Sequence, residues 1–130
     1  MKKIILSFLF LSAMAMAELT QVWSTPGFGD KGIKIIDIRT PAEWKETGIV
    51  DGSYTIMFFD EKGDFNLENF LRHLDMAVKK DEQFALICRV GSRTGMVAEF
   101  LSDKLGYKVI NLKGGIMKMI HEGYKTVPYK

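Results

Sequence analysis

Short apolar segments alternate along the chain with segments in which apolar residues recur every three or four positions. The short segments are bounded by turn residues, as expected for buried strands, and they cover residues 33–38, 54–59, 84–88 and 108–112. The intervening segments predict helices from residue 41, from 66 to about 79, from 94 to 105 and from 116 to 123. Residues 18–32 are rich in turn formers, and the pattern assigns no element to them.

Local signals support several of these helix ends. Thr40 with Glu43 three residues later has the spacing of a capping box, and Pro41 occupies the first helical position. Asn66 can cap the second helix, and Gly106 can end the third. Strands that alternate with helices predict an α/β domain with a mostly parallel sheet. In such sheets, ligand sites form beyond the carboxyl ends of the strands.

The first 17 residues have the layout of a secretory signal peptide. Lys2 and Lys3 precede an apolar run from Ile4 to Leu11, and small residues follow up to Ala17. The apolar run is too short to span a bilayer comfortably. We therefore predict a signal peptide over 1–17, a single domain over 18–130, no membrane span after processing, and a periplasmic or secreted location in a bacterium.

Cleavage after Ala17 fits the pattern best, and cleavage after Ala15 stays open as a second register. We expect the mature protein to begin at Glu18. Amino-terminal sequencing of the exported protein measures this directly. An intact Met1 in the exported fraction would contradict the prediction.

Composition narrows the class of protein further. The chain has 130 residues, of which 47% are apolar and 26% charged, as in one globular domain. A single cysteine excludes an internal disulfide, so the apolar core must hold the fold. Without residues 1–17 the chain has 16 basic and 16 acidic residues. This balance gives no sign of nucleic acid or a membrane surface as a partner.

The single cysteine, Cys88, lies where the third predicted strand stops. The segment Cys88-Arg89-Val90-Gly91-Ser92-Arg93 connects it to the helix predicted from Thr94. Free amides at the helix start, a glycine loop that can turn its N–H groups inward, and two arginines all favour a thiolate over a thiol. We therefore predict a reactive nucleophile beside an anion-binding loop, rather than a cysteine kept for packing.

The segment CRVGSRT resembles the active-site loop of the rhodanese-like sulfurtransferases, which reads C-R-x-G-x-R-[ST]. The segments IIDIRTPAEW, GYKVINLKGGI and EGYKTV are similar, in the same order, to three further parts of that family. The resemblance covers about residues 33–127. It implies a rhodanese-like three-layer fold, with a mostly parallel central sheet flanked by helices.

The resemblance also implies a reaction. Cys88 would accept the sulfane sulfur of an anionic donor such as thiosulfate, hold it as a persulfide, and pass it to a thiol or cyanide. The family pattern gives the substrate-binding positions as Arg89, Val90, Gly91, Ser92, Arg93 and Thr94, with the two arginines orienting the donor and the amides stabilising the anionic sulfur. Asp37, Arg39 and Glu43 match positions that brace the site. The chemistry needs no metal and no other cofactor, and a protein could serve as the sulfur acceptor.

Two other classes of function stay open at this point. The domain could be a non-catalytic binding or regulatory module, because one fold hosts many functions. Phosphoryl or arsenate chemistry is the other, although phosphatases of related design carry an arginine at the position of Thr94, and this loop closes at Arg93. His73 and His121 are expected on the solvated surface, and a pairing of one of them with the cysteine stays open.

Overall fold

The computed structural model describes residues 17–130, and the expectations for residues 1–16 lie outside this range. Its strands are β1 (Glu18–Trp23), β2 (Ile35–Asp37), β3 (Tyr54–Thr55), β4 (Phe84–Ile87) and β5 (Lys108–Lys113). Its helices are the 3-10 helix η1 (Pro26–Asp30), then α2 (Pro41–Thr47), α3 (Leu67–Ala77), α4 (Ser92–Leu105) and α5 (Gly115–His121). Within residues 17–130, none of the helices combines the length and the apolar character needed to cross a membrane.

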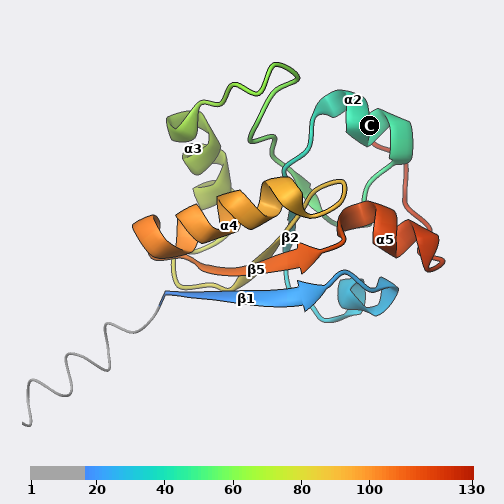
Figure 1. Cartoon of the computed structure of the whole chain (residues 1–130), viewed down its shortest axis with the longest axis horizontal. Coiled ribbons are helices and arrows are strands. Elements are labelled where there is room, and N and C mark those ends of the chain that lie inside the picture. Colours follow the sequence, from blue (N-terminus) through green and yellow to red (C-terminus); the bar gives the residue numbers. More distant parts are fainter. Residues whose placement is uncertain (1–16) are drawn as a thin grey trace, which may run out of the picture.

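The five strands form one parallel sheet in the order β1-β5-β4-β2-β3, with helices on both faces (Figure 1). Side chains of successive residues in a strand point to opposite faces. Phe84, Leu86 and Cys88 therefore pack with α3 and α4, whereas Ala85 and Ile87 pack with α5 and η1. These two apolar clusters make a three-layer α/β domain, and the predicted fold class is confirmed.

Strand β1 is an element that the sequence pattern missed. It lies at one edge of the sheet and pairs with β5 in parallel, from Glu18 opposite Lys108 to Trp23 opposite Lys113. Its residues are all exposed or half-buried. An edge strand of this kind lacks the continuous apolar run that marks a central parallel strand. The sequence pattern therefore assigned no element to residues 18–32.

Strand β3 is much shorter than the apolar segment 54–59 from which it was predicted. Regular pairing covers Tyr54–Thr55, and single backbone hydrogen bonds then follow from Ile56 to Asp37 and from Phe58 to Ile38, both 3.0 Å long. Phe58 packs against three other rings, those of Phe59, Phe65 and Phe70. The apolar residues in this segment therefore mark an aromatic cluster and not a longer strand.

The helix ends match their signals, with one correction. Both hydrogen bonds of the predicted capping box between Thr40 and Glu43 are present, and the Asn66 side chain caps α3. Helix α4 begins at Ser92 and not at Thr94, because Gly91 serves as its cap with a φ of +100°. A left-handed cap suits glycine, and it lets the helix start immediately after the turn that follows Cys88.

Candidate active site

The Cys88 thiol lies directly beyond the carboxyl end of β4, against the first turn of α4. Residues 88–94, called here the Cys88 loop, hold it there. The backbone N–H of Gly91 donates a hydrogen bond to Sγ over 3.2 Å, and Oγ1 of Thr94 lies 3.5 Å from the same sulfur. The Thr94 hydroxyl also donates to the Gly91 carbonyl over 3.2 Å. The sulfur therefore accepts a hydrogen bond from a backbone amide at the amino terminus of α4, where the helix dipole favours negative charge.

The first turn of α5 fixes the other side of the Cys88 loop. The amides of Ile116 and Met117 donate to the carbonyls of Cys88 and Arg89 over 2.9 and 3.1 Å. Gly115 has a φ of +64°, and a Cβ atom there would overlap the carbonyl of Arg89. Only glycine fits such a close backbone approach without strain. The Gly114-Gly115 pair that follows β5 is thus a contact surface for the Cys88 loop.

Both arginines of the Cys88 loop form ion pairs with helix α2. The Arg93 guanidinium grips Glu43 with two hydrogen bonds, from Nη1 to Oε1 over 2.7 Å and from Nη2 to Oε2 over 2.8 Å. Arg89 Nη1 lies 3.1 Å from Oε1 of Glu46 on the more exposed side of the same helix. Two carboxylates therefore balance the positive charge that the sequence indicated at the loop.

Sequence reasoning missed Glu46 and assigned Glu43 only a bracing role. A signal was available, because glutamates three residues apart in a helix lie on one face. These two lie on the face of α2 that meets the Cys88 loop.

The ion pair with Arg93 is intact at neutral pH. The hydrogen bond from Arg93 holds the pKa of the Glu43 carboxyl below its usual value, and the positive charge of Arg93 acts in the same direction. The hydrogen bond to Glu43 raises the pKa of Arg93, and the nearby Cys88 sulfur contributes in the same direction. A carboxyl with a lowered pKa in the folded state adds stability above its unfolded pKa and loses that contribution as the pH falls through the folded value. The pair therefore weakens only under acidic conditions.

Asp37 and Arg39 form a second ion pair behind the site, and both side chains are completely buried. Arg39 donates from Nη2 to Oδ2 of Asp37 over 2.9 Å, and from Nε to Oδ1 over 3.0 Å. Its remaining donors reach Oγ1 of Thr47 over 2.9 Å and the carbonyl of Gly48 over 3.0 Å. This network joins the end of β2 to the end of α2, and it thereby fixes the helix that carries Glu43 and Glu46.

The structure separates the predicted substrate-binding residues into two groups. Gly91 and Thr94 contact the sulfur, and the Arg93 guanidinium, from the residue before Thr94, pairs with Glu43. Val90 and Ser92 are exposed, and Arg89 turns toward α2. His73 and His121 are exposed as well. Among residues 17–130, no group of three or more His, Cys, Asp and Glu side chains is arranged to hold a metal ion.

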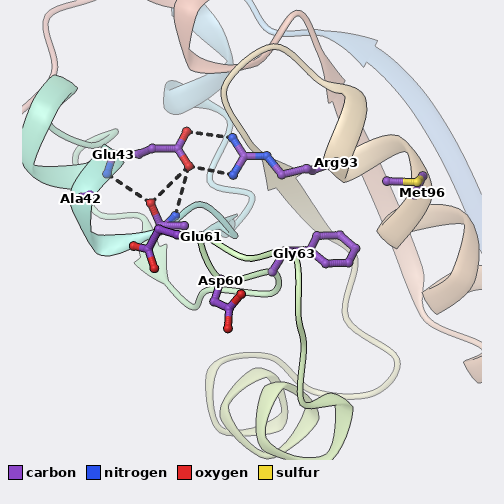
Figure 2. Close-up of a pocket in the computed structure, with 9 residues that line it drawn as sticks. Ala42, Glu43, Asp60, Glu61, Gly63, Arg93 and Met96 are labelled. Atoms are coloured by element: carbon purple, nitrogen blue, oxygen red, sulfur yellow. Dashed lines mark hydrogen bonds and ion pairs between the residues drawn. The ribbon is translucent and has the colours of Figure 1, made fainter.

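An open groove of about 620 Å³ lies next to the ion pair (Figure 2). Glu43 and Arg93 line it, together with Met96 from α4 and the carboxylates of Asp60 and Glu61 from the turn that follows β3. Sequence reasoning did not find this groove, because its walls come from three separate parts of the chain.

Comparison with known proteins agrees with this architecture. The sequence model of the rhodanese-like domain family matches residues 23–122. "Protein HIGH ARSENIC CONTENT 1, mitochondrial" from Arabidopsis thaliana is 25% identical over 108 residues, which cover 82% of this chain and 64% of that protein. "Putative sulfurtransferase YtwF" from Bacillus subtilis is 31% identical over 88 residues, or 68% of this chain and 74% of that protein. The chain spans less than two thirds of the length of the first curated relatives that it matches.

A solved structure leads to the same family. The rhodanese-related protein from Thermoplasma volcanium has a TM-score of 0.60 and 27% sequence identity, and the match covers 82% of this chain and 97% of that one. The family model covers most of the chain, including all of β2 to α5. The chain therefore belongs to the rhodanese-like domain family.

Proposed function

We propose that this protein is a sulfurtransferase that moves a sulfane sulfur from an anionic donor such as thiosulfate to a thiol or cyanide, through a persulfide on Cys88. The observation that carries the proposal is the hydrogen bond from the Gly91 amide to the Cys88 sulfur at the start of α4. The same amide can stabilise a thiolate before the reaction and an anionic persulfide after it. Membership in the rhodanese-like family and the name of the Bacillus subtilis relative support this class of reaction.

The loading step is a displacement at sulfur. The Cys88 thiolate attacks the outer sulfur of thiosulfate, a new S–S bond forms, and sulfite leaves with the electron pair of the bond that breaks. Thr94 has one hydroxyl hydrogen, which can point to the Gly91 carbonyl or to the sulfur. We expect it to turn to the sulfur whenever the sulfur is charged, because a charged acceptor makes the stronger hydrogen bond.

The donor must displace the residues over the sulfur before it can react, because Cys88 has no exposed surface. Arg93 is suited to guide it. A guanidinium has five N–H donors, and two of those on Arg93 point to Glu43. Arg93 can therefore bind a donor oxygen while Glu43 still holds it in place.

Intact-mass measurement after incubation with thiosulfate tests the function. We expect a gain of one sulfur atom, which cyanide or a thiol then removes. Absence of any gain would contradict the proposal and leave the non-catalytic module. Hydrolysis of p-nitrophenyl phosphate without sulfur uptake would instead indicate phosphoryl chemistry.

We also propose that the protein acts in the periplasm or outside the cell, on the basis of residues 1–17.

We expect Arg93→Ala to lower kcat/KM for thiosulfate about ten- to a hundredfold, which is the loss of about 1.5–3 kcal/mol expected for one charged hydrogen-bond partner. Part of this loss comes from Glu43, whose carboxylate would then face the anionic donor without its cationic partner. The double variant Glu43→Gln/Arg93→Ala should recover that part, because glutamine keeps the capping interaction without the charge.

Steady-state kinetics with thiosulfate measures both variants. Arg72→Ala is a matched control, since Arg72 is an exposed residue on α3 that pairs with Asn69. Unchanged kinetics in Arg93→Ala would remove Arg93 from the donor site.

A further inference from the structure

The groove beside the Cys88 loop has walls that are mainly apolar. Phe59 from the segment after β3, Met96 of α4 and Ala42 of α2 contribute to them. Met96 is 62% exposed, although apolar side chains of this size are usually buried. The groove therefore offers apolar surface to a bound molecule.

The charged part of the lining is acidic. Four charged side chains line the groove among the residues that the structure describes, and two of them, Glu43 and Arg93, form an ion pair. The other two are Asp60 and Glu61 (Figure 2). The net charge of the lining is therefore negative. Lys62 belongs to the same turn and is exposed.

The two carboxylates have different local roles. Oδ1 of Asp60 accepts hydrogen bonds from the amides of Lys62 and Asp64, both 2.9 Å long, and so shapes the turn. Glu61 is exposed beside the groove. Its charge can be changed without removing the hydrogen bonds that define the turn.

Cys88 is buried and does not line the groove, which borders the Cys88 loop at Arg93. This residue lines the groove, and the residue that follows it, Thr94, lies 3.5 Å from Sγ of Cys88. Asp60 and Glu61 would repel a dianionic donor from the part of the groove that they line, and thiosulfate has no apolar part to place against the wall. The molecule that fits the groove is therefore the second substrate of the reaction.

We propose that this groove binds the sulfur acceptor, and that Asp60 and Glu61 select small thiols that are cationic or uncharged over anionic thiols. The inference rests on the proposed sulfurtransferase function and names the acceptor class for the same site. The acceptor thiolate attacks the outer sulfur of the Cys88 persulfide, and the new S–S bond joins acceptor and sulfur. The bond to Cys88 breaks, its electron pair returns to Sγ, and solvent takes the thiol proton.

Single-turnover kinetics tests the proposal, starting from protein whose Cys88 already carries a sulfur atom taken from thiosulfate. Three thiols of similar size carry different charges: cysteamine is a cation, 2-mercaptoethanol is uncharged and 3-mercaptopropionate is an anion. Intact-mass measurement follows the loss of the extra sulfur in the native protein and in Glu61→Lys. The intrinsic reactivity of each thiol is the same with both proteins, so their comparison isolates the effect of the groove.

We expect Glu61→Lys to reduce the ratio of the cysteamine rate to the 3-mercaptopropionate rate roughly tenfold at low ionic strength, and less at high salt. The rate with 2-mercaptoethanol should stay the same. Glu61→Gln, which changes the charge by half as much, should give an intermediate ratio.

Asp103→Lys is the matched control, because it makes the same change of charge at an exposed position near the end of α4. At a rise of 1.5 Å per residue it lies about 15 Å along the helix from Arg93, beyond the screening length at physiological salt. It should keep the native ratio. An unchanged ratio in Glu61→Lys, or an equal change in Asp103→Lys, would overturn the proposal even though the protein loads sulfur. Failure to load any sulfur would overturn the proposed function first, and the acceptor groove with it.

Discussion

Cys88→Ser is expected to lose sulfur uptake from thiosulfate completely while it keeps the native fold. A serine hydroxyl is not ionised at neutral pH and cannot form a persulfide, so the reaction has no nucleophile. The fold should tolerate the change, because the Gly91 amide and the Thr94 hydroxyl that now contact the sulfur can form hydrogen bonds with a buried hydroxyl. Intact-mass measurement after exposure to thiosulfate gives the uptake, and thermal unfolding gives the stability.

Met76→Ser is the control for this experiment. It introduces the same residue type on α3, outside the Cys88 loop, at a side chain that is 78% exposed. It should load sulfur as the native protein does. Sulfur uptake by a correctly folded Cys88→Ser variant would show that the sulfur is carried elsewhere, and the proposed persulfide on Cys88 would be wrong.

The largest effect on stability is expected from Arg39→Met. Removing one partner of a completely buried ion pair should lower the free energy of unfolding by about 3–5 kcal/mol, because the other charge stays buried without compensation. In this protein the uncompensated charge is that of Asp37, and the oxygens of Thr47 and Gly48 lose a donor as well. Denaturant unfolding followed by circular dichroism measures the difference.

The double variant Asp37→Asn/Arg39→Met separates the charge from the rest of the network. In the native protein the backbone N–H of Arg39 donates to Oδ1 of Asp37 over 3.1 Å. Asparagine at position 37 can still accept this hydrogen bond from the backbone of residue 39, and it leaves no buried charge. We therefore expect it to be more stable than Arg39→Met alone. Arg72→Met on the exposed face of α3 should change the stability little. A similar small loss in Arg39→Met would mean that this ion pair does not brace the site.

The sequence was sufficient for the parts of the fold that local chemistry determines. The capping box of Thr40 and Glu43 was visible because both of its residues lie within one helical turn. Strand β4 was visible because both of its faces are buried. Strand β1 was missed because an edge strand is only partly buried, and the start of α4 was misplaced because Gly91 adopts a left-handed conformation that no neighbouring residue signals.

The position of Cys88 was also predictable, since the end of an apolar run and the start of a helix both point to it. Its electrostatic surroundings were not. The sequence showed two arginines in the loop but not their partners, Glu43 and Glu46, which pair with them across more than forty residues of chain. Likewise, the groove beside Arg93 exists only after α2, α4 and the turn at Asp60 have come together. The helical spacing of Glu43 and Glu46 places them on one face, but no local pattern shows which part of the chain that face meets.

The place of β1 in the sheet has a consequence for the order in which the protein can fold. This strand is the first of the five in the chain, but its partner β5 is the last, and Glu18 lies opposite Lys108. Closing so long a loop is costly in entropy, and contacts between distant residues slow folding. A ribosome releases β1 first, yet β1 must wait for nearly the whole chain before it can pair. The sheet therefore closes only after synthesis has passed β5, and until then Leu19 and Val22, half-buried in the finished domain, lack their final neighbours.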